Sequence, residues 1–579
     1  MVRATFAGFS TAMSAIQASQ KRLDITGQNL ANANTVGYTR QQLQVSSLNY
    51  TNPVSHYMNS SYVGVGFGVH MEKVTQIRDP YLDMQYRGQI QKSGYTDAMQ
   101  TSLDRLAEYL DESQIDGIRS AFDDIQATLQ AMSDTTDVND AVFEAELRTR
   151  MQALSNKLNE AAREIDKAAM EEFNHLDGTG TSEQGAVQRV NDILQQIGKL
   201  NRQIKQNQIM GQPSLELMDD RNVLLDELAS YIPIEVSYYK DAEHDGLDGL
   251  GVDDGQHDGE KYHLDSSGNI IMKKEWPDDL RVTMSYVDAQ GITQKLVLVE
   301  GTVGQGDENY GQVSIPNSDD IRSGKVKPGD VELKFSGFEY TTEPDKYGQT
   351  KKDVDMAQGR VEFPDGSGSI QAGLDMLWKD GKTPGIADVR GYDFYMNQLD
   401  NLAKSFAGVM NEINKEYGGG ALLASKDGAA DITASNIGIS EGWVNGTVHV
   451  AEGNADDNPN ATILDMLEAM QTTYPIKGGN LGYLTVKPDL DNNTFSNFMN
   501  HTSTILANDS YSNTNSLKTN MTVLNGIQNS RDSVSGVSFN EEASNMMMHM
   551  SAYNAASRLM TTLDQALDVL INGTGVVGR

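Results

Sequence analysis

At 579 residues, the chain is long enough for roughly three or four domains, each with a hydrophobic core of its own. It carries 81 acidic against 46 basic residues, a formal net charge of −35. Nucleic acid and acidic membrane surfaces are therefore poor partners, because both are bound through Lys and Arg. Cysteine is absent, which excludes a disulfide framework, a thiolate nucleophile and a cysteine metal site.

The first predicted element is an N-terminal amphipathic helix. We expect it to end within residues 32–40, because Asn34 and Gly37 tolerate the left-handed backbone of a helix end. Its apolar residues recur at alternating spacings of three and four, the seam of a coiled-coil-like helix. The seam consists of Phe6, Phe9, Met13, Ile16, Leu23 and Leu30, interrupted by Gln20 and Gly27.

The next stretch leads into a long helical region. A short strand is expected at 41–47. The glycine-spaced run 63–69 could suggest a nucleotide loop, but it does not fit GxGxxG and no helix follows directly, so a glycine-kinked strand or extended arm is the better interpretation. Residues 81–230 are predicted to be mostly helical, which implies an antiparallel bundle. The breaks between its helices are expected near 133–137, 177–180 and 210–213.

After Pro233 the hydrophobic period becomes two, which predicts a β-rich region. Helix returns at 388–417, and a mixed insert at 421–492 precedes a further helix at 494–529. The strand candidates of the β-rich region are 280–287, 295–299, 331–338 and 361–363.

The chain closes with a second single-seam helix. A helix that is apolar along one stripe cannot bury that stripe alone, so the two terminal helices are expected to pack on each other or on neighbouring copies. This pattern is typical of an assembly protein. The second seam consists of Met546, His549, Tyr553, Ala556, Met560, Leu563, Leu567 and Leu570.

These elements together predict an α+β, multidomain chain that runs out and back. Its predicted parts are a terminal coiled-coil-like helix pair, a long helical bundle layer and β-rich outer inserted domains. The expected domains are 1–46 with 537–579 (terminal assembly), 47–233 with 385–420 and 493–536 (helical bundle), 234–384 (β-rich outer domain) and 421–492 (small mixed insert).

Five blocks resemble one known family. The run 31–40 (ANANTVGYTR) and the closing segment 533–542 (SVSGVSFNEE) are similar to the two ends of bacterial flagellar axial proteins, the family of rod, hook and hook-associated proteins. The run 77–82 (IRDPYL) resembles the same family. The runs 217–228 (LMDDRNVLLDEL) and 432–443 (ITASNIGISEGW) resemble its hook-associated members, which join hook to filament.

The resemblance implies a structural flagellar protein without catalysis or cofactor, which adapts a bendable hook to a stiffer filament. The implied partners are copies of the chain in a ring, the hook protein, a second junction protein on the filament side and an export chaperone, with no nucleic acid and no membrane. The sequence lacks a secretory signal and any apolar run of roughly 18 residues, which alone would indicate a cytoplasmic protein. The resemblance instead implies an extracellular flagellar location, reached without a cleaved signal peptide.

The assembly interface is expected at the two terminal seams. The competing interpretation is an ordinary helical core within one monomer. Asn34, Gly37 and Tyr38 are carried over from the family motif. The apolar candidates are Phe9, Met13, Ile16, Leu23 and Leu30, with Tyr553, Met560, Leu563, Leu567 and Leu570 as counterparts.

Two acidic stretches could suggest a cation site. The Asp-rich tract 241–260 matches no EF-hand spacing, and such a tract is typically a solvated loop. Asp489 and Asp491 begin like an EF-hand loop, but Thr494 stands where Gly is needed, so a turn and a helix cap are the better interpretation. We therefore predict no metal site.

Other patterns also have simple structural interpretations. Met546, Met547 and Met548 fit packing on a helix seam better than a soft-metal site. Glu541 and Glu542 are adjacent, so on a helix they point different ways, and they suit the first turn of the terminal helix. Neither GxSxG nor HExxH occurs, which favours a protein that is not an enzyme.

Two other functions remain open. A flagellar hook or distal rod protein would share both ends of the family pattern. A secreted adhesin or carbohydrate-binding protein would act through the β-rich inserts, with Trp276, Trp378 and Trp443 as stacking platforms for sugars.

Overall fold

The structure is a computed structural model. It describes residues 7–48, 68–110, 112–134, 141–178, 184–209, 214–239, 251–252, 262–264, 270–271, 279–300, 309–339, 350–357, 361–364, 366–381, 389–453, 458–476 and 480–573.

Helices build most of the described chain. The main ones are α1 (Ala7–Ala31), α2 (Pro80–Tyr109), α3 (Glu112–Ser133), α4 (Ala141–Asp177), α5 (Ala186–Ile209), α6 (Leu215–Tyr231), α9 (Ser369–Trp378), α10 (Tyr392–Glu416), α12 (Ala461–Gln471), α13 (Phe495–Ser535) and α14 (Phe539–Asp568). The short ones are α8 (Ser318–Arg322), α11 (Glu441–Val444), two 3-10 turns (Pro328–Asp330 and Asn480–Tyr483) and a π-helical turn (Val569–Gly573).

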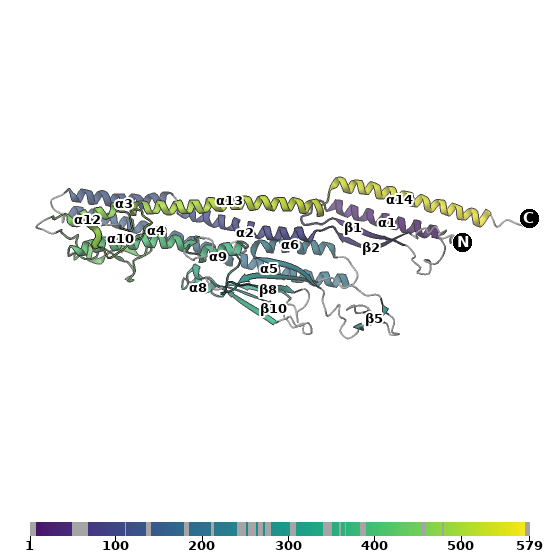
Figure 1. Ribbon diagram of the computed structural model, residues 1–579, viewed down its shortest axis with the longest axis horizontal. Coiled ribbons are helices and arrows are strands. Elements are labelled where there is room, and N and C mark those ends of the chain that lie inside the picture. Colours follow the sequence, from purple (N-terminus) through teal and green to yellow (C-terminus); the bar gives the residue numbers. More distant parts are fainter. Residues whose placement is uncertain are drawn as a thin grey trace, which may run out of the picture.

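The helices form an elongated body with both described chain ends at one tip (Figure 1). The chain runs out through α2 and α3 and returns through α13, which lies along both of them. At the tip, α14 lies along α1. This path agrees with the out-and-back chain expected from the sequence.

Local signals explain several helix boundaries. α2 begins where the Asp79 side chain accepts a hydrogen bond from the backbone N of Tyr81 at 2.9 Å, with Pro80 in the first turn. The predicted breaks near residues 133, 177 and 210 are confirmed by the ends of α3, α4 and α5. The break between α2 and α3 was not predicted.

The strands form one larger sheet and three small ones. In the larger sheet the order is β11-β10-β8-β7-β3, all antiparallel, with β9 also paired to β10. Its strands are β3 (Ile234–Tyr239), β7 (Asp279–Val287), β8 (Thr293–Glu300), β9 (Gln312–Ser314), β10 (Leu333–Glu339) and β11 (Thr350–Met356). The small sheets are β1 (Gln41–Ser47) with β2 (Val69–Gln76), β12 (Leu423–Ser425) with β13 (Ile437–Ile439), and β4 (Gly251–Val252), β5 (Tyr262–Leu264) and β6 (Ile270–Ile271).

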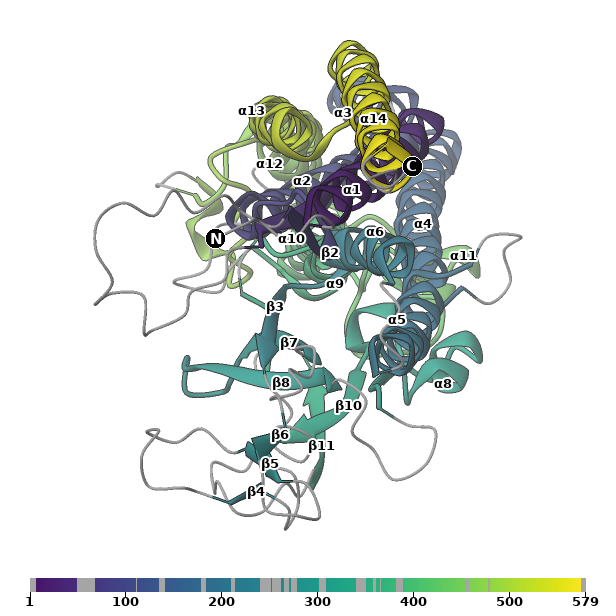
Figure 2. The ribbon, with the colours of Figure 1, turned by 90° about the vertical axis from the view of Figure 1, so that its right-hand side faces the viewer.

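The larger sheet projects from one side of the helical body and contacts it through α5 (Figure 2). The Asn191 side chain on α5 pairs with the backbone of Val313 in β9, through hydrogen bonds of 2.8 and 2.7 Å. Leu296 and Leu298 on β8 and Phe335 on β10 belong to the buried core. The α+β class and the β-rich outward projection predicted from the sequence are therefore present.

Two expectations about the end of the β-rich region were wrong. Residues 361–363 form only isolated bridges, such as Glu362 to Val287, rather than a strand. The following apolar run forms α9, which was not predicted and which contacts α2 and α4. A short, continuously apolar segment can form a strand or a buried helix, and periodicity does not distinguish them. The wider domain boundaries stay predictions.

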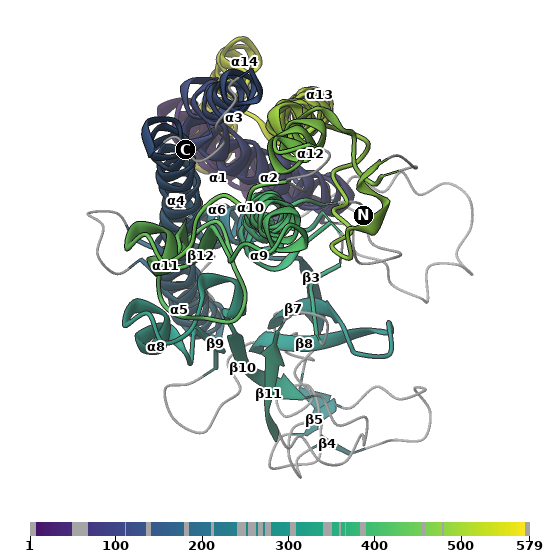
Figure 3. The same ribbon diagram turned by 90° about the vertical axis from the view of Figure 1, so that its left-hand side faces the viewer.

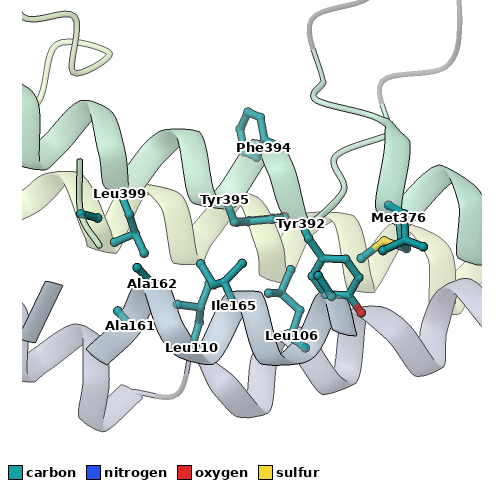
Figure 4. Close-up of a cluster of buried hydrophobic side chains, with 14 of the residues drawn as sticks. Leu106, Leu110, Ala161, Ala162, Ile165, Met376, Tyr392, Phe394, Tyr395 and Leu399 are labelled. Carbon is teal, nitrogen blue, oxygen red and sulfur yellow. The ribbon is translucent and has the colours of Figure 1, made fainter. Parts of the chain in front are cut away.

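Side chains from four helices meet in the core of the helical body. Figure 4 shows Leu106 on α2 and Ile165 on α4 beside Tyr395 on α10, with Met376 on α9 further along the same cluster. Such a contiguous buried core stabilises the body in a single chain.

Figure 3 looks onto the end of the body opposite the termini, where α3, α10, α12 and α13 lie. Three of these helices, α3, α10 and α13, contribute to an aromatic cluster. Phe122 on α3, Phe406 on α10 and Phe495 on α13 have ring centroids 5.3–6.0 Å apart, and Tyr474 lies 4.9 Å from Phe495. These buried rings fix the start of α13 against the bundle.

The rest of α13 is held differently. Its buried residues end at Leu506, although the helix continues for 29 residues beyond. Along α2 the contacts are hydrogen bonds: Asn513 Nδ2 donates to the Thr96 carbonyl at 2.8 Å, and Gln89 Nε2 donates to the Asn520 carbonyl at 3.1 Å. The C-terminal part of α13 is therefore attached by polar groups rather than by an apolar core.

Two tryptophans are buried in the body. Trp378 Nε1 donates to the Val331 carbonyl at 3.0 Å, and Trp443 Nε1 donates to Glu144 Oε1 at 2.6 Å. Neither ring is available to stack on a sugar, which removes this support for an adhesin. Trp276 lies outside the described residues.

A histidine beside Trp443 should make stability depend on pH. His449 lies 3.1 Å from Glu144, and the hydrogen bond and charge of this carboxylate raise the pKa of the imidazole. The pKa of the imidazole is higher in the folded state than in the unfolded state, where it is about 6.5. The contact therefore stabilises the fold fully at pH values below about 6.5, and this stabilisation is lost as the pH rises through the folded-state pKa. We expect the melting temperature of wild type to exceed that of His449→Gln at about pH 5.5, with the gap closing towards about pH 9. A gap independent of pH would contradict this.

Candidate assembly site: the terminal helix pair and its joint to the body

The two terminal helices lie side by side at one end of the molecule (Figures 1 and 2). Gly8 on α1 faces Leu563 on α14, and Asn29 hydrogen-bonds Glu542 at 3.1 Å. Gly8 and Asn29 are 21 residues apart, and so are Glu542 and Leu563, so the pair is antiparallel in one register. The expected packing of the two helices on each other is present within one chain.

Most of the predicted seam residues lie near the contact between the helices without being enclosed by it. Met13 and Leu570 are 55% and 53% exposed. Apart from Ile25, the buried residues of α1 are small or polar: Ala12, Ala18, Ser19, Thr26 and Asn29. The partly buried seam residues are Phe9, Ile16, Leu23, Leu30, Tyr553, Met560, Leu563 and Leu567.

α14 is the most exposed long helix of the body and tip. Only Glu542 and Ala556 are buried along its described length. Met547, Met548, Met550 and Leu559 are all about half exposed. A single chain therefore leaves much of the apolar surface of its last helix in contact with water.

A cluster of polar side chains joins this pair to the helical body. We call it the polar joint. It consists of Asn29, Tyr38, Thr39, Arg40, Asp83, Asp219, Asp226, Arg531, Glu541 and Glu542.

Asn29 is the buried centre of the half of the polar joint nearest the terminal pair. Its side chain is 1% exposed and makes four hydrogen bonds. The amide NH₂ donates to the Gln41 carbonyl at 3.0 Å and to Glu542 at 3.1 Å. The amide oxygen accepts from the Tyr38 hydroxyl and from the Gln41 backbone N, both at 3.0 Å. One side chain thus connects α1, the turn after it and the first turn of α14.

Thr39 and Arg40 connect the same turn to the body and to the chain's return. Thr39 donates to Asp219 on α6 through its backbone N at 3.0 Å and its hydroxyl at 2.7 Å. The backbone N of Arg40 donates to the Ser535 carbonyl at 2.9 Å, and its guanidinium lies 2.7 Å from Glu541. The turn is therefore attached to α6 and to the α13–α14 connection at once.

Arg531 closes the half of the polar joint nearest the body. Its guanidinium lies 2.9 Å from Asp83 on α2 and 2.7 Å from Asp226 on α6. Arg78 and Arg87 pair with the same two carboxylates at 2.5 and 2.9 Å. All five side chains are at most 16% exposed, and Arg78 also lies 3.7 Å from Asp219, so three cations face three carboxylates in a mostly dry site.

Burial in the polar joint also shifts protonation. Burial, followed by the charges of nearby carboxylates including Glu216, raises the pKa of Tyr38, which keeps its hydroxyl as a donor to Asn29. Burial raises the pKa of Asp219, while the hydrogen bonds from Thr39 oppose that rise. Beside the polar joint, burial and then the charge of Arg22 lower the pKa of His549.

Of the three motif residues, the structure places two at the polar joint. Tyr38 bonds to Asn29, and Gly37 forms the turn with φ +79°. Asn34 is exposed in the same turn.

Gly37 should not tolerate a side chain. Alanine there would hold a left-handed backbone, and its Cβ would lie 2.3 Å from Val223 Cγ2. Since the exposed Val223 side chain can shift, we expect Gly37→Ala to cost about 1–2 kcal/mol of unfolding free energy, mainly from the backbone. Gly27→Ala is the matched control, because nothing lies within 4 Å and a helical Gly→Ala change should stabilise by about 0.5–1 kcal/mol. Urea denaturation of both variants measures this, and equal effects would contradict it.

Four of the five family-like blocks supply residues of the polar joint or residues bonded to it. The blocks 31–40, 217–228 and 533–542 supply members of the joint: Tyr38, Thr39, Arg40, Asp219, Asp226, Glu541 and Glu542. The block 77–82 supplies Arg78, which pairs with Asp83, and 533–542 also supplies the Ser535 carbonyl that Arg40 contacts. The apolar seams were predicted from the sequence as the assembly interface, whereas Asn29 and Arg531 were not predicted. The sequence offered one hint for Asn29: a polar residue at a helix position where α1 is expected to be buried.

The structure also places the acidic residues that could have suggested a catalytic or metal site. Glu541 and Glu542 do lie in the first turn of α14 and point differently, one towards Arg40 and one towards Asn29. Asp491 lies in a left-handed turn, and Thr494 occupies the cap position of α13 without a side-chain cap bond. Most of the tract 241–260 lies outside the described residues. Across the described chain, no group of three or more metal-binding side chains occurs, and no helix is long and apolar enough to cross a membrane.

Two family models match parts of this chain. Residues 9–39, which cover α1 and its turn, match the flagella basal body rod protein family. Residues 103–253 match the family described as the flagellar hook-associated protein FlgK helical domain.

Curated relatives match over almost the whole chain. Flagellar hook-associated protein 1 of Bacillus subtilis is 28% identical over 99% of both chains. Its namesake in Escherichia coli is 24% identical over 97% of this chain and 99% of that one. A solved structure, the flagellar hook junction protein FlgK from Burkholderia pseudomallei, aligns at 18% identity and TM-score 0.35 over 59% of this chain and 46% of that one.

The paired terminal helices and the rod-family match on α1 define the class: a structural protein of the bacterial flagellar axis. Within that class, the relatives over nearly the full length are all hook-associated proteins. The chain belongs to the family of flagellar hook-associated protein 1.

Proposed function

We propose that this chain is a non-catalytic structural subunit that joins the hook to the filament of a bacterial flagellum. The observation that carries the proposal is the terminal helix pair, which leaves large apolar side chains exposed in a single chain. Such side chains are stabilised when neighbouring subunits cover them. The names of the full-length relatives support the hook–filament position.

The proposed assembly is a ring of copies that contact one another through the terminal pairs. The hook protein lies on one side of the ring and a second junction protein on the other. The chain reaches this extracellular position without a cleaved signal peptide, and an export chaperone accompanies it before assembly. The larger sheet, which projects to one side, faces outwards in this arrangement.

Cells that lack the gene test the position in the flagellum. We expect electron microscopy to show hooks without filaments, and flagellin to accumulate in the medium. Cells without hooks would move the protein to the hook or distal rod. Normal filaments would overturn a flagellar junction role altogether.

Single polar substitutions in the seams test the assembly surface. Met13→Ser and Leu570→Ser each alter a side chain that is about half exposed, so the monomer should unfold as wild type does. If neighbours bury these side chains, each change should weaken assembly by up to about 1.5–3 kcal/mol. Immunoblots of purified hook–filament complexes measure the loss.

Val444→Ser is the matched control, because Val444 is an exposed apolar residue on the helical body. Its incorporation should stay at the wild-type level. Unchanged incorporation of the Met13 and Leu570 variants would contradict their place in the interface.

A further inference from the structure

A pocket of about 400 Å³ lies between α1, β1 and α14, beside the polar joint. Arg22, Arg40 and His549 line it. Arg22 makes no ion pair or hydrogen bond within the described part of the chain. The Nε of Arg40 is buried without a hydrogen-bond partner, although another nitrogen of that guanidinium pairs with Glu541. Two guanidinium groups thus have donors free for an anionic occupant.

The positive charge of Arg22 also affects the protonation of His549, which lines the same pocket. Burial and then Arg22 lower the pKa of His549, against the opposing effect of Glu542. Glu542 lines the same pocket and accepts a hydrogen bond from Asn29, and Glu541 pairs with Arg40, so neither carboxylate forms an ion pair with Arg22. An added carboxylate would therefore meet a guanidinium that has no direct ion-pair partner.

The opposite flank of α14 carries two carboxylates. At about 100° per residue, Met548, Leu559 and Leu570 share one face of the helix, and Met548 lines the pocket. Asp564 and Asp568 lie on roughly the opposite face and are exposed. Asp564 has no ion pair among the described residues, and Asp568 accepts a hydrogen bond from Asn572. The pair of helices therefore has a pocket with an unpaired arginine, Arg22, on one flank and two exposed carboxylates on the opposite flank.

These two features cannot meet within one chain. The antiparallel register places Arg22 level with His549. Asp564 and Asp568 lie 15 and 19 residues further along α14, about 22 and 28 Å away along the axis. Complementary surfaces on opposite flanks and at different heights make a head-to-tail contact between copies, which builds rings or helical arrays.

We propose that this pocket binds the carboxylate of Asp564 or Asp568 from the next copy of the chain. The proposal rests on the proposed function, since it requires copies that assemble through their terminal pairs. It adds the partner residues and the relative position of neighbours: the next copy is displaced by about 22–28 Å along the helix pair. In this contact the apolar face with Met548, Leu559 and Leu570 packs against the next copy. The ion pair determines the register between the two copies.

Cysteine crosslinking with a bismaleimide about as long as an arginine side chain tests the contact directly, because the natural chain has no cysteine. We expect Arg22→Cys combined with Asp564→Cys, or with Asp568→Cys, to give dimers and higher multiples in crosslinked hook–filament complexes. The unassembled monomer should give none, since the two positions lie about 22–28 Å apart along its helix pair. Lys21→Cys with Asp564→Cys is the matched control, because Lys21 lines a different groove, against β1 and β2.

Charge reversal gives a second measurement. Arg22→Glu should reduce the amount of the chain retained on hooks about two- to fivefold, the range of an exposed ion pair. Lys21→Glu, the same charge change on the neighbouring residue, should have no such effect. Adding Asp564→Lys and Asp568→Lys to Arg22→Glu should restore retention.

The outcomes separate this inference from the proposed function. If the unsubstituted chain is present at the hook–filament junction by immunogold labelling but the cysteine pairs do not crosslink, the pocket contact is wrong and the function stands. If the chain is absent from flagella, both fall. Should Arg22→Glu fail to fold, as judged by its melting curve, the cysteine pairs alone decide.

Discussion

Arg531→Met is expected to lower the unfolding free energy by about 3 kcal/mol, the lower end of the cost of breaking a buried ion pair. The substitution removes the cation that bridges Asp83 and Asp226, at 2.9 and 2.7 Å. Each carboxylate keeps one arginine, Arg78 or Arg87, which is why we do not expect the full cost. The effect is still large, because the C-terminal part of α13 has no apolar core to hold it against α2.

Urea denaturation of the purified chain measures this loss. Limited proteolysis should also show earlier cleavage near the connection between α13 and α14. Arg558→Met is the matched control, since Arg558 is exposed on α14 and has no ion pair in the described chain. Equal loss in the two variants, or none in either, would mean that Arg531 does not hold α13 to the body.

Asn29→Leu is expected to detach the terminal helix pair from the body while the body stays folded. Leucine has a similar volume but leaves Tyr38, Glu542 and both backbone groups of Gln41 without their partner. A buried group without a partner costs about 1–3 kcal/mol, so the local loss should exceed about 3 kcal/mol. Hydrogen exchange should then accelerate across α1 and α14 and remain slow in α4 and α10.

Gln28→Leu provides the control for this second variant. Gln28 is the neighbouring residue on α1, its side chain is exposed, and the same substitution should leave exchange unchanged. Retained protection of α1 and α14 in Asn29→Leu would show that apolar contacts alone hold the pair. In that case the polar joint would set the orientation of the terminal helix pair relative to the body without stabilising the pair.

The two variants separate two mechanical roles of the polar joint. Asn29 connects the terminal helices to each other and to the turn after α1, whereas Arg531 connects the returning helix to α2 and α6. In the proposed assembly, forces would pass between the ring and the outer body through both connections. We therefore expect either variant to reduce the filament-bearing fraction of cells, with Arg531→Met retaining a folded terminal pair.

The sequence by itself predicted the elements whose causes are local. The alternation of three and four in the two terminal segments predicted α1 and α14, and turn residues located the breaks after α3, α4 and α5. β1 was predicted at its observed bounds, directly after the turn at Gly37. By contrast α9 was missed, since nine of its ten residues are buried and no periodic signal remains.

Only the tertiary structure decided which residues make the polar joint. Asn29 and Glu542 are 513 residues apart, and Arg40 and Glu541 are 501 apart, so no local pattern relates them. Similarity to a family identified the blocks but not the atoms that meet, and it gave no reason to choose Asn29 or Arg531. Hydrogen bonds and ion pairs depend on distances of about 3 Å between side chains. Such distances follow from how the outgoing and returning halves of the chain pack, and the sequence specifies that packing only through the whole fold.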